Sequence, residues 1–272
     1  MQRLISSSAN AFVYGEEIGA HVKALGDWLI GMIANLEQNE EKLESDFTRA
    51  LAGQLQDWRP GLPPPPRVML RAALETFFQA PAAIADFGVS IGRPLWGFKW
   101  PSYSADHLRL LLALMPRSKV VYVFRRPLDT LKSAKARRFV TSLEEVEGFC
   151  RTWAKNFGEV MKMAQDKRFL PLCYEDLCAD PPANCRRLEA FTGARGIQLR
   201  VFDVRVNTFV GEAAEGRSPT QYIQPQALTA DERDLVTTLA DPAAALFYGA
   251  QRPERASAPS PRRREGGPGR RR

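Results

Sequence analysis

Two arginines and a serine near the middle of the chain have the residue types and spacing to bind a phosphate group. Arg125–Arg126 come directly after the apolar run Lys119–Phe124, and Ser133 follows in the segment that Pro127 opens. An arginine fork and a serine hydroxyl that converge beside a helix start can clamp a phosphate. The alternative is an ordinary strand-to-helix turn, in which Pro127 favours the first helical position and the arginines are solvated. Spacing alone leaves both interpretations open.

The elements that must position these residues alternate between strand-like and helix-like segments from about residue 85 onward. This order predicts an α/β fold, with a parallel sheet covered by helices on both faces. The expected strands are Leu95–Trp100, Lys119–Phe124 and Arg168–Tyr174. Pro171 removes one hydrogen-bond donor from the third, which indicates an edge or irregular strand. Because the carboxyl ends of parallel strands form the ligand crevice, Arg125 is expected at its rim.

Helical periodicity and capping signals define the elements of the C-terminal half. Apolar residues at helical spacing predict a helix over residues 143–165. Pro181–Pro182 opens another helix, which ends before Gly193. Thr229 and Glu232 form a capping box at the start of a third.

The N-terminal third is predicted to be mostly helical. The expected helices are Glu17–Leu36 and Glu41–Leu55. Pro60 and the run Pro63–Pro66 separate them from the rest of the chain, and we interpret this run as a surface connection within one domain.

The central motif resembles that of a known enzyme family. Arg125, Pro127, Asp129 and Ser133, after an apolar strand, are similar to the 3′-phosphate-binding motif of sulfotransferases that use 3′-phosphoadenosine-5′-phosphosulfate (PAPS). In that family the arginine and the serine hold the 3′-phosphate of the nucleotide. The resemblance, which covers roughly residues 4–249, therefore implies a P-loop NTPase-like sulfotransferase fold with PAPS bound by Arg125 and Ser133.

Three other segments agree with the same family in order and spacing. Val13–Glu17 resembles the Gly-Glu segment of the tyrosylprotein and related carbohydrate sulfotransferases. Gly97–Pro101 resembles the strand that delivers a lysine to the transferring sulfuryl group, and Leu172–Leu177 resembles the Tyr-Glu-Asp-Leu segment after the fourth strand. Four weak motifs in the right order are more specific than any one of them.

These segments imply roles for three further side chains. By resemblance, Glu17 is the base that takes the acceptor's proton, Glu16 is the second candidate, and Lys99 stabilises negative charge on the transferring group. The alternative is that the glutamates complement a helix start and Lys99 extends from a sheet edge into solvent. His107, eight residues beyond Lys99, is expected to be an ordinary surface or rim histidine.

The chain departs from the family at its start. In the family a strand and a short phosphosulfate-binding loop precede the first helix, whereas Met1–Ile5 resembles the interior of that helix. Either Met1 is an internal methionine of a longer enzyme, or the chain is a short relative that has lost catalysis. A missing central strand predicts marginal stability or self-association through the open edge. Ser6–Ser8 are not expected to replace the loop, and Arg217, within Gly211–Ser218, is the remaining candidate contact with the nucleotide.

Charge and cysteine usage narrow the class of protein. Residues 252–272 contain eight arginines and two glutamates, and so carry +6 of the formal net charge of +7. We predict a sulfotransferase-like domain at 1–250 and a disordered tail at 251–272, without specific nucleic-acid binding because no aromatic residues interleave the arginines. The four cysteines and two histidines show no zinc-site spacing, so no metal is expected. Reduced thiols and the lack of a long apolar run favour a cytoplasmic protein without a membrane span.

Three functions remain from the sequence. The first is sulfuryl transfer from PAPS to a hydroxyl group of a small molecule, carbohydrate or peptide acceptor. The second is a truncated or inactive relative that binds a nucleotide or a protein partner. The third is a polyanion-binding adaptor that acts through the arginine tail, and it ranks last.

Overall fold

The strands of the described chain form two parallel pairs. The computed structural model describes residues 1–54, 64–101, 103–203 and 225–251. Within these residues β1 (Ala11–Tyr14) pairs with β2 (Leu95–Phe98), and β3 (Val120–Phe124) pairs with β4 (Phe169–Cys173). Both pairs are parallel. The predicted α/β class with parallel strands is therefore confirmed.

Helices connect the strands in the order that the sequence predicts. Those between consecutive strands are α2 (Glu16–Leu51), α3 (Pro66–Ser90), α4 (Ala105–Leu114), α5 (Pro127–Ala136) and α6 (Leu143–Met161). The remaining elements are α1 (Gln2–Ser6), α7 (Tyr174–Ala179), α8 (Pro181–Thr192), η1 (Leu199–Asp203), α9 (Ala230–Leu235), η3 (Val236–Ala240) and α10 (Asp241–Gln251).

Helices cover both faces of the β3–β4 pair, because alternate side chains of a strand point to opposite faces. On one face Leu172 packs in a cluster with Leu188 of α8. On the other face Phe169 packs with Leu108 of α4 and Val160 of α6. The strand pair is thus enclosed in the way expected of a parallel sheet.

One buried cluster joins the two strand pairs. Ala11 of β1 and Leu172 of β4 belong to it, and Val13, Leu95 and Val121 pack against it from three of the strands. Leu172 is completely buried. Burial of one such leucine contributes about 1.5–3 kcal/mol, so this cluster is a principal reason that the two pairs stay together.

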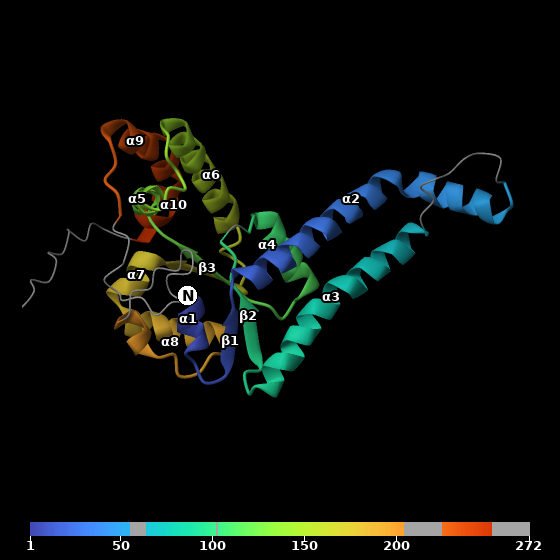
Figure 1. Ribbon diagram of the computed structural model, residues 1–272, viewed down its shortest axis with the longest axis horizontal. Helices are drawn as coiled ribbons and strands as arrows, with labels where there is room; N and C mark the ends of the chain where they lie inside the picture. Colours follow the sequence, from blue (N-terminus) through green and yellow to red (C-terminus); the bar gives the residue numbers. More distant parts are fainter. Residues whose placement is uncertain (55–63, 102, 204–224, 252–272) are drawn as a thin grey trace, which may run out of the picture.

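α2 and α3 form a long arm that projects from the rest of the molecule (Figure 1). α2 has 36 residues, which corresponds to about 54 Å. The prediction of two helices, Glu17–Leu36 and Glu41–Leu55, was therefore wrong. Residues 37–40 have no apolar side chain, yet they also have no glycine or proline, and the helix continues through them. Residues 55–63, which include Pro60, lie outside the described residues, and Pro66 is the first residue of α3.

The three predicted strands are present, each shorter than expected by one to two residues at one or both ends. Pro171 lies in β4, which pairs with β3 alone among the described strands, as expected of an edge strand. β1 was missed, although its sequence Ala-Phe-Val-Tyr is apolar throughout. The predicted helix over 143–165 is α6, and the predicted starts of α8 and α9 are confirmed, the latter with its capping box.

Candidate functional site

Three of the predicted site residues closely follow the carboxyl ends of strands. Glu16 comes after β1, Lys99 after β2 and Arg125 after β3. Glu175 comes after β4 in the same way. Because the strands within each pair are parallel, their carboxyl ends lie at a common edge, where ligands bind in α/β folds.

Glu16 and Lys99 form an ion pair that joins the ends of β1 and β2. Glu16 is the first residue of α2, and its side chain is 50% exposed against 38% for Lys99. Exposed pairs of this kind contribute less than about 1 kcal/mol to the free energy of unfolding. The pair therefore matters more for the position of the two charges than for stability.

Gly19 explains why the start of α2 lies so close to Lys99. A Cβ at Gly19 would overlap the carbonyl oxygen of Lys99 and lie 2.8 Å from Cβ of Trp100. The Tyr103 hydroxyl donates a hydrogen bond to the Gly19 carbonyl at 2.7 Å. Because residues three apart share one helix face, the close approach at Gly19 also brings Glu16 toward Lys99.

The structure places Glu17 differently from Glu16. Its side chain is exposed in the first turn of α2, and among the described residues the glutamate that pairs with Lys99 is Glu16. The assignment of the base to Glu17 rests on the family resemblance, and it stays a prediction. Glu16, the second candidate for the base, is the glutamate that contacts Lys99.

Two buried hydrogen-bond donors beside this pair were not predicted from the sequence. The hydroxyl of Tyr14 and Nε1 of Trp100 are buried without a hydrogen-bond partner in the described part of the chain. Tyr14 ends β1 and Trp100 lies two residues beyond β2. An unsatisfied buried donor costs about 1–3 kcal/mol, so each of these two donors calls for an acceptor, which a water or a ligand oxygen could supply.

Arg125 has the same property at the end of β3. Its Nε is buried and has no hydrogen-bond partner within the described residues. Its guanidinium lies over the ring of Tyr174, 5.2 Å from the centroid. Pro127 begins α5 and Asp129 lies in its first turn, as predicted. Ser133 is half-buried further along the same helix, so one strand-helix unit carries both predicted phosphate contacts.

Glu175 holds the turn that carries Arg125. Its carboxylate accepts the Arg126 amide at 3.0 Å, the Cys173 thiol at 3.0 Å and the Tyr248 hydroxyl at 3.3 Å. Burial opposes ionisation of Glu175, but the Arg126 amide and the Cys173 thiol outweigh it, and its pKa lies below the ordinary value. The same burial, together with Glu175, raises the pKa of Cys173 to about 11. Sequence analysis placed Glu175 only within a segment that resembles the family, and missed this contact.

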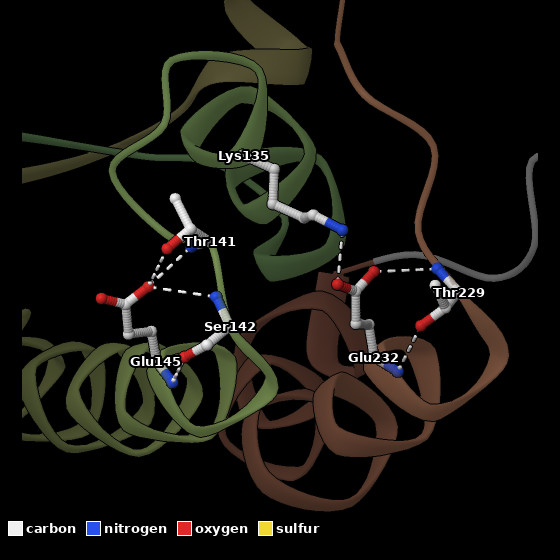
Figure 2. A network of polar contacts seen from close by, with 6 residues as sticks. All are labelled: Lys135, Thr141, Ser142, Glu145, Thr229 and Glu232. Carbon is white, nitrogen blue, oxygen red and sulfur yellow. Dashed lines mark hydrogen bonds and ion pairs between the residues drawn. The ribbon is translucent and has the colours of Figure 1, made fainter.

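A network of polar contacts fixes α5 from its other end (Figure 2). Lys135 of α5 pairs with Glu232 of α9, and both side chains are 10% exposed. Glu232 also accepts the Thr229 amide at 2.8 Å, within the predicted capping box. The Gln226 amide donates to the Lys132 carbonyl at 3.1 Å. The segment before α9 is thereby attached to the helix that carries Ser133.

Two further residues from the sequence analysis are Arg217 and His107. Arg217 lies outside the described residues, so its contact with a nucleotide stays a prediction. His107 was expected to be an ordinary surface or rim histidine, and its side chain is 12% exposed. Its Nε2 lies 2.5 Å from Oδ1 of Asp27, and its Nδ1 lies 2.5 Å from Oγ of Ser104. His107 therefore connects α4 to α2. That role is visible only once the long helix α2 is placed beside α4.

Among the described residues no group of three or more histidine, cysteine or acidic side chains is arranged to hold a metal ion. None of the helices in the same residues is both long and apolar enough to cross a bilayer.

The comparison with known families decides the assignment. The model of the sulfotransferase family matches residues 5–196, which include all four strands and the residues Glu16, Lys99, Arg125 and Ser133. The chain belongs to the sulfotransferase family. No curated protein sequence matches this sulfotransferase. Among solved structures, the sulfotransferase domain of the olefin synthase from Synechococcus PCC 7002 is similar, with 19% sequence identity and a TM-score of 0.43. That alignment covers 87% of this chain and 88% of that domain.

Proposed function

We propose that this sulfotransferase transfers a sulfuryl group from PAPS to a hydroxyl group of its acceptor. The observation that carries the proposal is Arg125, whose Nε is buried and has no partner among the described residues, at the carboxyl end of β3 in a chain of this family. An arginine at the carboxyl end of a strand, with its Nε unsatisfied among the described residues, fits an anionic group of the substrate.

The residues present fit a nucleotide phosphate at the β3–α5 turn. Arg125 offers a guanidinium fork, which matches phosphate geometry, and Ser133 offers a hydroxyl from the same strand-helix unit. Tyr174 supports the Arg125 guanidinium on one side. Arg217 is proposed as a third contact, on the basis of the sequence.

The ends of β1 and β2 are proposed to hold the reacting groups. PAPS supplies the sulfuryl group that the acceptor oxygen attacks. Glu17, or Glu16 by its contact with Lys99, takes the proton of the acceptor hydroxyl. Lys99 then stabilises the negative charge that develops on the transferring group and on the leaving phosphate oxygen. Most of the remaining work is positioning, and no metal is assigned a role.

The acceptor class is proposed only in outline. A hydroxyl-bearing small molecule, a carbohydrate and a peptide are each compatible with a carboxylate base beside a lysine. Tyr14 and Trp100 add two buried donors at this end of the site, which suit an oxygen-rich group.

The direct test of nucleotide binding is calorimetric titration with 3′,5′-adenosine bisphosphate, the product nucleotide. Arg125→Ala should raise the dissociation constant at least about tenfold, because a hydrogen bond to a charged group contributes about 1.5–3 kcal/mol. Arg187→Ala, which removes an exposed arginine from α8, is the matched control and should bind like the wild type. Equal affinity of the Arg125→Ala variant and the wild type would contradict the proposed phosphate site.

A further inference from the structure

We propose that Glu175 and Tyr248 are positioning residues that hold the Arg125–Arg126 turn in the shape that binds the 3′-phosphate. This inference rests on the proposed function, because it concerns the same anion site. Glu175 belongs to α7, and Tyr248 belongs to α10, which lies beyond the part of the chain that the family model matches.

Glu175 fixes the backbone of the turn rather than a side chain of it. Oε1 accepts the Arg126 amide at 3.0 Å, while Oε2 accepts from Cys173 at 3.0 Å and from Tyr248 at 3.3 Å. A carboxylate that is engaged by three donors is held in one orientation. The turn is consequently set by the protein itself, before any ligand binds, which lowers the cost of binding.

The same contacts leave the guanidinium of Arg125 available. Glu175 lies beside the turn that carries the two arginines, yet its oxygen atoms accept a backbone amide, a thiol and a hydroxyl. Arg125 instead lies over the ring of Tyr174, with its Nε buried and unpartnered within the described chain. A carboxylate used in this way positions the turn through its backbone amide, and its charge also attracts Arg126.

Two consecutive residues of α7 hold two consecutive residues of the turn. Tyr174 supports the guanidinium of Arg125 from one ring face, and Glu175 accepts the amide of Arg126. A shift of α7 would therefore move both arginines together. This arrangement explains how a turn of two arginines, which repel each other, keeps a single geometry.

Tyr248 extends this control to the C-terminal helix. Its hydroxyl donates to Glu175, and its ring lies under the guanidinium of Arg126, 5.6 Å from the centroid. Its neighbour Phe247 packs edge-on against Phe124, the last residue of β3, with 4.6 Å between the ring centroids. α10 is thus attached to the strand, to the turn and to the residue that orients the turn.

A positioning role and a purely structural role predict different binding patterns. Loss of the turn geometry lowers the affinity for ligands that carry a 3′-phosphate. A general loss of stability lowers the affinity for all nucleotides alike. The informative quantity is therefore the ratio of affinities for 3′,5′-adenosine bisphosphate and for 5′-AMP, which lacks the 3′-phosphate.

The experiment measures this ratio by calorimetry in the full chain. Glu175→Ala should reduce affinity for 3′,5′-adenosine bisphosphate about tenfold and affinity for 5′-AMP by less than about threefold. Glu175→Gln should recover most of the loss, because its amide oxygen can still accept the Arg126 amide. Tyr248→Phe keeps the ring and should cost only about two- to threefold in the same ratio.

Glu189→Ala is the matched control. Glu189 of α8 also accepts a backbone amide, that of Ile197 at 2.7 Å, but it lies on a different element and contacts neither arginine. This variant should leave the affinity ratio unchanged. An equal fall in the ratio for Glu175→Ala and Glu189→Ala, or an equal loss for both nucleotides in Glu175→Ala, would overturn the proposal.

Hydrogen exchange of the Arg126 amide, measured without nucleotide, separates this proposal from the proposed function. Glu175→Ala should speed this exchange, and Glu189→Ala should not. If the wild type binds neither nucleotide but shows this pattern, the turn is held as proposed and the nucleotide assignment fails. Unchanged exchange in Glu175→Ala overturns the positioning role, whatever the wild type binds.

Discussion

The two ends of the candidate site are built in opposite ways. At the β3–α5 turn, Arg125 and Arg126 are held by several contacts, which come from Glu175, Tyr174 and Tyr248 on two different helices. At the ends of β1 and β2, Glu16 and Lys99 meet through a pair whose side chains are 50% and 38% exposed.

This difference matches the different demands on the two ends. A nucleotide-binding end gains from a fixed geometry, because a preorganised site loses less conformational entropy on binding. A reacting end must keep its base and its lysine accessible to the acceptor, and it must exchange protons. The comparison predicts that variants at the first end change affinity and stability, whereas variants of the charged side chains at the second end change turnover.

The largest effect is expected at the reacting end. Replacement of the true base by glutamine should lower kcat about 10²- to 10⁴-fold with little change in the melting temperature. Glu17→Gln and Glu16→Gln, compared in sulfuryl transfer from radiolabelled PAPS, decide between the two glutamates. If kcat falls for Glu16→Gln alone, the base is Glu16, which forms the ion pair with Lys99, and not Glu17, which the family resemblance favours. Unaltered kcat in both variants would remove the base from this end.

The next effect tests the anchor of the nucleotide-binding end. Lys135→Met should lower the free energy of unfolding by about 3 kcal/mol, because it leaves the Glu232 carboxylate buried without its cation. Denaturant unfolding is the measurement. Lys162→Met is the matched control, since its pair with Glu159 is exposed and should contribute less than about 1 kcal/mol. Equal losses in the two variants would mean that α5 is not anchored by Glu232.

Replacement of Gly19 is expected to have a smaller effect, on the stability of the protein. Gly19→Ala should cost about 1–3 kcal/mol, because its methyl group would overlap the Lys99 carbonyl and push α2 away. Gly31→Ala on the same helix has no atom within 4 Å of the new Cβ and should stabilise by about 1 kcal/mol. Thermal unfolding of both variants checks the direction. A stabilised Gly19→Ala variant would show that the close contact of α2 with Lys99 is not required.

The smallest effect is a dependence of stability on pH. Burial opposes ionisation of Glu232, but its bonds with Lys135 and the Thr229 amide prevail, and its pKa lies below the ordinary value of 4.5. Its stabilising contribution is therefore complete above that value, and it is lost as pH falls through the lower pKa of the folded state. Glu232→Gln should lose less stability than the wild type between neutral pH and about pH 3, as measured by urea unfolding. An identical acid dependence in the two proteins would count against this contribution.

Much of the fold could be read from local sequence signals. The apolar run before Arg125 predicted β3, and Thr229 with Glu232 predicted the start of α9, because strand burial and capping are properties of neighbouring residues. The 36-residue helix α2 was divided in error, since a polar stretch at 37–40 weakens the periodic pattern without ending the helix. β1 was missed because a run of four apolar residues is too short to show the alternating pattern that distinguishes a strand from a loop.

The site was predicted only as separate segments. Order along the chain suggested Lys99 and Arg125, but not that Glu16 is the residue beside Lys99. Contacts such as that of Tyr248 with Glu175 join residues 73 positions apart, and the sequence around neither residue predicts the contact. Resemblance identifies residues one segment at a time, whereas tertiary packing decides which of them meet.

The most direct test of the central claim is sulfuryl transfer itself. Purified chain, radiolabelled PAPS and a panel of phenols, sugars and tyrosyl peptides should yield a labelled acceptor, and Lys99→Ala should abolish the label while the protein stays folded. Label that appears with the wild type and disappears with this variant is the predicted result. A wild-type chain that binds 3′,5′-adenosine bisphosphate but labels no acceptor, or a Lys99→Ala variant as active as the wild type, would contradict the proposed chemistry.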